Sequence, residues 1–133
     1  GRLYPWGNTF DCRLGNFDDE VSLDPYVVPG GANCDGYPET SPVGAFPSGA
    51  SPYGLLDMAG NVFEWTADWY AELYYSSQAT WQNPLGPPGG DYRVLGGGSW
   101  RSVSWNVRTA FRAANLPEHR LVDRGFRCLL AAP

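Results

Sequence analysis

The stretch that decides the fold is Gly96-Gly-Gly-Ser-Trp100. Consecutive glycines let the backbone turn sharply where a residue with a Cβ atom would be strained. A spaced skeleton follows at Arg108, Ala110, Arg112, Pro117 and Arg120, and the series closes with Gly125-Phe-Arg-Cys128. Upstream stands a second marked stretch, Gly54-Leu-Leu-Asp-Met-Ala-Gly-Asn-Val-Phe-Glu-Trp65. Between these stretches the chain shows little periodicity, which predicts a fold dominated by turns.

Composition supports this view. The 133 residues suffice for one domain or less, and 17 Gly with 12 Pro favour loops over regular elements. Six Trp and eight Tyr supply core volume in their place. The net charge of −5 argues against a nucleic-acid-binding surface, and no apolar run is long enough to span a membrane. The chain begins at Gly1 without Met, so we expect a fragment or a processed product.

Few regular elements are expected. Residues 55–70 are predicted to form one short helix, with Trp65 and Trp69 on one face. Strands are predicted over 92–95, 107–113 and 126–130, and a surface loop over 76–91.

These spaced motifs resemble the formylglycine-generating enzyme superfamily, from Gly1 to about Cys128. The resemblance implies an irregular, loop-rich α+β fold of the C-type lectin-like type. It also implies that residues 1–133 are the C-terminal part of one such domain. The N-terminal half of the domain is then expected as a partner, on another chain, because it would cover a sheet edge left open here.

The same resemblance implies two calcium loops. In the first, calcium would be bound by the side chains of Asp57 and Glu64 and by the carbonyl oxygens of Gly60 and Val62. In the second, the ligands would be the side chains of Asn16 and Asp35 and the carbonyl oxygens of Phe17 and Tyr37. Such hard oxygen sets suit calcium. The alternative is that these residues only cap turns. Either ion would be structural, cross-linking irregular backbone.

The family's oxidase binds copper through two cysteines after the glycine turn. Ser102 and Val107 occupy the matching positions, and neither can supply a thiolate, so no copper is expected. His119 is the only histidine, which excludes a multi-histidine iron site made by this chain alone. Of the three cysteines, Cys128 is expected to be buried, and a bridge between Cys12 and Cys34 is left open.

Residues 101–124 form a candidate variable, ligand-binding surface. Varied residues fill the gaps in the skeleton without helical or strand period: Arg101, Ser102, Val103, Asn106, Phe111, Ala113, Ala114, Leu116, His119, Leu121, Val122, Asp123 and Arg124. This pattern is similar to variable proteins of diversity-generating retroelements. Adenine-directed mutation of Asn codons cannot yield Lys, Gln, Glu, Met or Trp, and none of these types occurs in the set. Trp105, which would be template-encoded, is a further candidate anchor of the surface.

The sequence thus predicts a calcium-stabilised binding protein, without catalytic residues of its own, for an unidentified protein or small ligand. Two alternatives remain open. One is an ordinary degenerate surface. The other is a divergent oxidase, or an iron-dependent sulfoxide synthase-like enzyme, whose catalytic groups lie outside this chain.

Overall fold

The computed structural model describes residues 1–18, 34–76, 82, 84 and 86–128. Within these residues the regular elements are two short 3₁₀ helices and four strands. They are listed here in chain order: η1 (Cys12–Leu14), η2 (Pro47–Gly49), β1 (Phe63–Trp69), β2 (Arg93–Gly96), β3 (Ala113–Asn115) and β4 (Arg124–Gly125). The strands form one mixed sheet in the order β3-β2-β1-β4, in which only the β1–β4 pair is parallel. No helix in the described part is long and apolar enough to cross a membrane.

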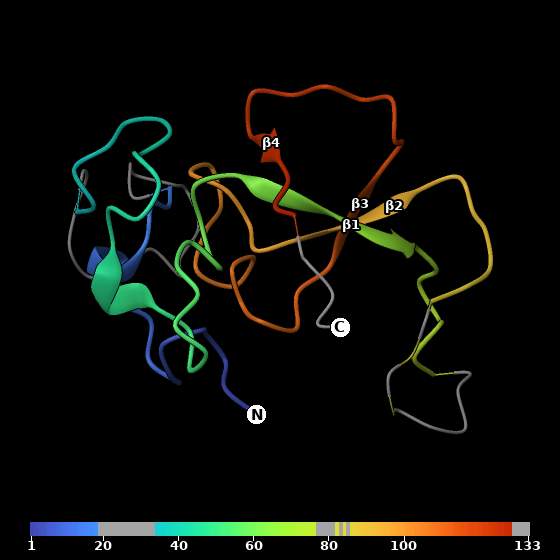
Figure 1. Ribbon diagram of the computed structural model, residues 1–133, viewed down its shortest axis with the longest axis horizontal. Helices are drawn as coiled ribbons and strands as arrows, with labels where there is room; N and C mark the ends of the chain where they lie inside the picture. Colours follow the sequence, from blue (N-terminus) through green and yellow to red (C-terminus); the bar gives the residue numbers. More distant parts are fainter. Residues whose placement is uncertain (19–33, 77–81, 83, 85, 129–133) are drawn as a thin grey trace.

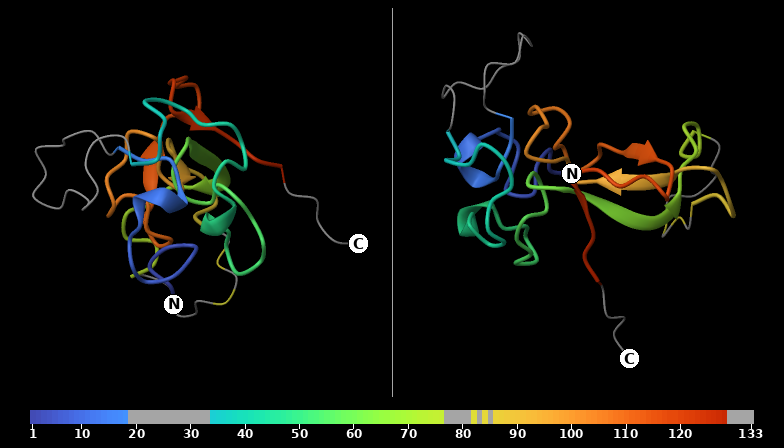
Figure 2. Two further views of the ribbon diagram at one scale, coloured as in Figure 1. Left: turned by 90° about the vertical axis from the view of Figure 1, so that its left-hand side faces the viewer. Right: turned by 90° about the horizontal axis from the view of Figure 1, so that it is seen from above.

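The sheet lies apart from the segments that carry η1 and η2 (Figure 1). Figure 1 places the strands toward one end and the segments with η1 and η2 toward the other, and Figure 2 shows the same separation from above. The chain between β3 and β4 arches away from the sheet before it returns to pair beside β1 (Figure 1). This arch, residues 116–123, carries much of the predicted variable surface.

The helix predicted over residues 55–70 is wrong. Residues 63–69 form β1, which pairs with β2 at Trp65↔Leu95 and Trp69↔Arg93, with an irregularity in between. Aromatic residues and Thr favour a strand, and a four-residue spacing with a register irregularity imitates a helical face. Because the described residues contain no α-helix, the expected α+β class is not confirmed.

Of the other predicted strands, one is confirmed and the others are wrong. The strand over 92–95 is confirmed as β2, and its Leu95 is completely buried. The strand over 107–113 is wrong, since residues 107–110 lie in turns and β3 begins at Ala113. The closing strand predicted over 126–130 is wrong at residues 126–128, because the last strand of the described part is β4 at 124–125 and Phe126 beyond it is 76% exposed. Residues 129–130, predicted to continue this strand, lie outside the described part of the chain.

The main core lies beneath the glycine turn. Tyr4, Phe17, Ala59 and Val107 form a buried cluster, against which the partly buried Trp6 and Phe10 pack. The rings contact one another over centroid distances of 5.2–6.5 Å, so aromatic volume replaces regular layers. This cluster ties the N-terminal segment to the segment after β2.

One disulfide fastens the loop end. Cys12 and Cys34 are bonded, with their Cα atoms 5.9 Å apart, which resolves the pairing that the sequence left open. Asp11 caps η1 by accepting from the Arg13 amide, and the Arg13 side chain beside it lowers the pKa of Asp11 to about 2. The expectation of a buried Cys128 is wrong, because its thiol is free and exposed.

Candidate functional site

The glycine turn after β2 brings two later positions together. Gly97 and Gly98 have φ angles of 84° and 74°, the left-handed conformations that favour glycine. A Cβ atom on Gly98 would lie 2.5 Å from Val107 Cγ1 and 3.3 Å from Ser102 Cβ. Ser102 and Val107 therefore both pack against the Cα atom of Gly98.

These two positions are structural in this chain. Ser102 is 6% exposed, and its Oγ accepts a hydrogen bond from the Ser99 amide at 2.9 Å. Val107 is 1% exposed and belongs to the core cluster. The nitrogen Nδ1 of His119 lies 2.8 Å from Asn115 Oδ1, so its contact is local to the arch. Ser102 was expected on the displayed surface, but it is buried and does not contribute to that surface.

A polar cluster joins the arch to β1. The carboxylate of Asp123 pairs with Arg124 at 2.7 Å, and its Oδ2 lies 3.4 Å from the buried Ser99 Oγ. The Arg124 guanidinium also lies 4.6 Å from the centre of the Phe63 ring. Both side chains of the ion pair are about 15% exposed. Asp123 and Arg124 were predicted to face outward, but they anchor the end of the arch instead.

The remaining surface candidates divide by exposure. The exposed ones are Arg101, Trp105, His119, Leu121 and Val122. The half-buried ones are Val103, Asn106, Phe111, Ala113, Ala114 and Leu116. Trp105 and Phe111 meet edge to face at 6.0 Å, whereas Ala113 and Ala114 pair with β2 as part of β3. The outward-facing residues thus lie on the turn after Trp100 and on the arch, two segments separated by β3.

The skeleton arginines make modest contacts. Arg108 is exposed and donates from Nε to the Trp105 carbonyl at 2.9 Å. Arg112 lies over the rings of Tyr75 and Tyr70, at 4.5 and 5.3 Å. Among the described residues, ion pairs are formed by Arg13, Arg124 and Arg127 rather than by these two.

In the second predicted metal loop, the carboxylate of Asp35 lies next to the segment that carries the buried Asn16. Asn16 is 1% exposed, and its Nδ2 donates to the Glu39 carbonyl at 2.6 Å. Its Oδ1 is buried and has no hydrogen-bond partner among the described residues. Beside it, Asp35 accepts from the amides of Phe17 and Tyr37, at 2.7 and 2.8 Å. A buried oxygen without a donor costs free energy unless a cation or a water satisfies it, so Asn16 Oδ1 is the atom of this loop that could accept either one.

The first predicted metal loop is differently arranged. Asp57 Oδ2 accepts from the Gly44 amide at 2.7 Å, and Glu64 is ion-paired with Arg127. Gly60 packs directly onto Asn16 and Phe17. The backbone N–H of Asn61 donates to the backbone carbonyl of Asn16 at 2.9 Å. The two loops are therefore in contact. No cluster of three His, Cys, Asp or Glu side chains that could hold a metal occurs among the described residues.

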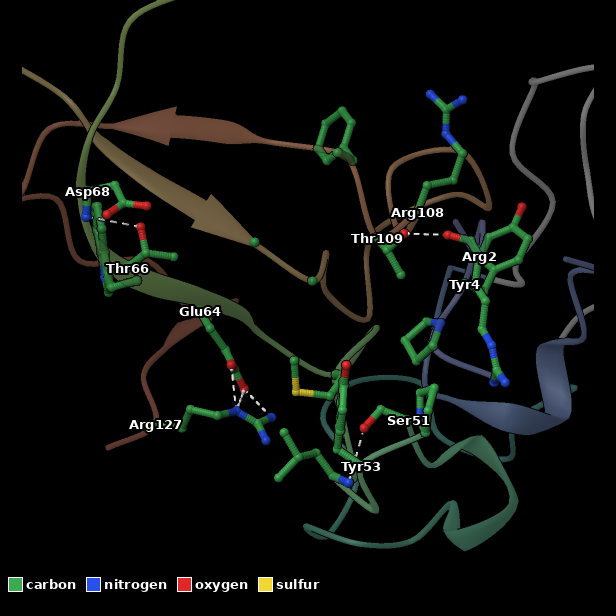
Figure 3. Close-up of a pocket in the computed structure, with 18 of the residues that line it drawn as sticks. Arg2, Tyr4, Ser51, Tyr53, Glu64, Thr66, Asp68, Arg108, Thr109 and Arg127 are labelled. Atoms are coloured by element: carbon green, nitrogen blue, oxygen red, sulfur yellow. Dashed lines mark hydrogen bonds and ion pairs between the residues drawn. The ribbon is translucent and has the colours of Figure 1, made fainter. Parts of the chain in front are cut away.

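An open cavity of about 1000 Å³ lies beside β1. Figure 3 shows Arg2, Arg108 and Thr109 on one side of this cavity and Glu64 with Arg127 on the other. Aromatic and apolar side chains line it as well, among them Tyr4, Tyr53, Met58, Trp65 and Phe111. Only Arg108, Thr109 and Phe111 come from the predicted variable segment, so the cavity is largely distinct from that surface.

Arg127 and Asn61 are two important residues that the sequence did not single out. Asn61 is buried and exchanges two hydrogen bonds with the backbone of Ser41, at 3.1 and 3.2 Å. Arg127 stands inside the Gly125–Cys128 motif, and that position was the available signal. Its role depends on Glu64, 63 residues earlier, which no local pattern reveals.

Comparison with known proteins settles the family. The model of the sulfatase-modifying factor enzyme 1-like domain matches residues 1–132. The chain belongs to this family. It is 38% identical over 130 residues to the formylglycine-generating enzyme of Bos taurus, covering 96% of this chain and 33% of that protein. It is also 50% identical over 129 residues to a protein named serine/threonine-protein kinase Pkn1 of Chlamydia trachomatis serovar L2, covering 96% of this chain and 18% of that protein.

A solved structure of the family's fold also resembles the chain. The variable protein 1 of Treponema denticola matches with a TM-score of 0.67 and 27% identity, over 92% of this chain and 39% of that one. The suspected superfamily is thus confirmed. The chain spans a third or less of these two curated relatives, and their names describe the longer proteins.

Proposed function

We propose that this domain is a non-catalytic binding module that displays a variable surface on a C-type lectin-like scaffold. The observation that carries the proposal is the pair Ser102 and Val107, packed together against Gly98. The family's oxidase needs two thiolates at these positions, and here a buried hydroxyl and an apolar side chain fill the space. The structural similarity to a variable protein supports the same conclusion.

The exposed residues supply suitable binding groups. Trp105, Leu121 and Val122 are 47%, 50% and 76% exposed, with Arg101 and His119 also at the surface. Aromatic, aliphatic and arginine side chains of this kind act as anchors in protein interfaces. The arch on which Leu121 and Val122 lie is fixed at its end by the Asp123–Arg124 pair, so its tip can vary without disturbing the sheet.

The genomic locus provides the test of variation. A reverse transcriptase gene beside a near-identical, adenine-rich repeat of the codons for residues 101–124 is the expected result. Among natural isolates, substitutions should then concentrate at the exposed inserts and spare Arg112, Pro117 and Gly125. Substitutions spread evenly over skeleton and inserts, with no such repeat, would contradict the variable-protein proposal and leave an ordinary degenerate surface.

We also propose one structural calcium ion at the loop of Asn16 and Asp35. The support is the buried Asn16 Oδ1, which has no donor within the described part of the chain, together with the carboxylate of Asp35 beside the next residue, Phe17. Asn16 and Asp35 would supply side-chain oxygens, and Phe17 and Tyr37 would supply carbonyl oxygens. The ion would add to the Cys12–Cys34 bridge and to the hydrogen bonds that join this region to neighbouring loops.

We further propose that additional polypeptide, the N-terminal half of the same domain, covers the cavity beside β1. Its support is the β1 edge, which pairs with β4 only at Phe63 and Glu64, and the apolar lining of the cavity. Open edges and apolar hollows favour a covering partner. Amide exchange at Ala67 and Asp68 should be fast in this chain and slowed at least tenfold in the longest protein that contains it. Equal exchange in both would contradict the proposal.

A further inference from the structure

Arg127 lies after β4 and contacts the segment that leads into β1. Its Nε donates to both carboxylate oxygens of Glu64, at 2.8 and 2.6 Å, and its NH2 group also pairs with this carboxylate. NH1 donates to the Leu56 carbonyl and NH2 to the Asp57 carbonyl, each at 3.0 Å. One guanidinium therefore binds a carboxylate and two backbone carbonyls that come from residues 56–64. Figure 3 shows the Arg127 side chain reaching Glu64 from the C-terminal segment.

The segment that Arg127 closes is strained. Asp57 and Asn61 have φ angles of 54° and 61°, and they are the non-glycine residues with positive φ in the described part of the chain. Such conformations persist only where surrounding contacts enforce them. In an oxygen-rich loop, a divalent cation is one agent that can do so. Here the guanidinium makes the equivalent cross-link with directional hydrogen bonds.

A calcium ion does not fit the same loop. Arg127 donates hydrogen bonds to both carboxylate oxygens of Glu64, so the expected ligand of the ion is already paired with a guanidinium. A divalent ion bound to Glu64 would lie close to a fixed positive charge, and the repulsion would oppose its binding.

We propose that Arg127 is a built-in cation that occupies the first predicted calcium loop, so that this loop binds no calcium while Arg127 is present. The arginine also ties the segment after β4 to the entrance of β1, which makes docking of the C-terminal segment part of the closure of this loop. This inference refines the metal content proposed above, but it rests on the contacts of Arg127 and not on the ion at Asn16.

Calcium counting in the intact chain tests the proposal. Calorimetric titration and elemental analysis after dialysis should give one bound ion for the wild type, and the same count for Glu64→Gln. Arg127→Met keeps the apolar part of the side chain and frees Glu64, Leu56 and Asp57, so it should bind one ion more than the wild type. Adding Glu64→Gln to Arg127→Met should remove that extra ion. Arg127→Lys keeps a positive charge and should not gain the ion.

Two results would overturn the proposal. One is a wild-type protein that loses an ion on Glu64→Gln. The other is a folded Arg127→Met protein whose ion count equals that of the wild type. If Arg127→Met does not fold, the Glu64→Gln comparison decides alone. If the wild type binds no ion and Arg127→Met binds one, the exclusion of calcium by Arg127 is supported and the calcium site at Asn16 is refuted. The two proposals can therefore fail independently.

Discussion

At the scale of single residues, arginines that looked equivalent in the sequence differ in their burial and in their contacts. Arg108 and Arg112 belong to the regular skeleton, yet Arg108 is exposed and Arg112 contacts rings. Arg124 and Arg127, near the end of the chain, hold the half-buried carboxylates instead. Arg108 satisfies one backbone carbonyl, that of Trp105, and its spacing in the sequence shows that the position matters without showing this contact.

Replacement of Arg127 should therefore cost more stability than replacement of Arg108. Arg108→Ala removes one hydrogen bond to a carbonyl, a loss of about 1 kcal/mol. Arg127→Ala leaves Glu64 and two carbonyls without their donor. The cost should be about 2–3 kcal/mol, below the range for a fully buried pair because both side chains are partly exposed. Urea unfolding of both variants measures the difference, and equal midpoints would contradict this ranking.

Gly98 should be the most sensitive glycine of the turn. Gly98→Ala meets Val107 Cγ1 at 2.5 Å and adopts φ of 74°, so overpacking and backbone strain together should cost about 2–5 kcal/mol. Gly96→Ala is the matched control, since its Cβ atom would meet nothing within 4 Å. Thermal melts compare the two. A Gly98→Ala protein as stable as Gly96→Ala would show that the packing of Ser102 and Val107 is not tight.

At the scale of elements, the pairing between strands determined the secondary structure where the local sequence pattern did not. Trp65 and Trp69 have helical spacing, but β1 forms because β2 and β4 flank it. Tyr92–Leu95 was predictable, since an apolar core segment before a glycine turn has few alternatives. The start of β3 was missed because Val107 enters the core from a turn rather than from a strand. The sequence left the Cys12–Cys34 pairing open, and the structure shows that these two cysteines are bonded.

The arch should tolerate change at its tip and resist change at its base. Leu121→Ser and Val122→Ser replace exposed side chains and should alter stability by about 0.5 kcal/mol or less. Asp123→Ala leaves Arg124 and Ser99 without their partner and should cost about 2 kcal/mol. Chemical denaturation of the three variants provides the test. If the tip variants unfold as readily as Asp123→Ala, the arch is core and cannot serve as a binding surface.

The loop of Asn16 should respond to calcium. Chelation should lower the melting temperature, because an ion at a hundred times its Kd adds about 2.7 kcal/mol. Asn16→Ala should abolish the response by removing the unpaired oxygen. Asn61→Ala is the control, since it removes another buried amide with two hydrogen bonds and should lower stability without changing the response to calcium. A wild-type melt that is indifferent to calcium would refute the site.

At the scale of the whole molecule, the family membership was predictable from spaced motifs. The sequence alone also showed Ser102 and Val107 at the positions that match the copper cysteines of the family's oxidase. Ser102 and Val107 are five positions apart and meet only because Gly97 and Gly98 turn the chain. The outward face was only partly predictable, since exposure inside residues 101–124 depends on β3 and on the base of the arch. The cavity beside β1 had no sequence signal at all, because its lining comes from segments across the chain.

The central claim is that this scaffold lacks the copper oxidase function of its family. The direct measurement is formation of formylglycine on a cysteine-containing sulfatase peptide, with copper(I) and oxygen supplied, together with copper bound after dialysis. The longest protein that contains this chain should give no product above the enzyme-free control and no copper that depends on residues 102 and 107. Ser102→Cys/Val107→Cys, whose thiols would converge on Gly98, should gain copper. Formylglycine formed by the unaltered protein would contradict the account.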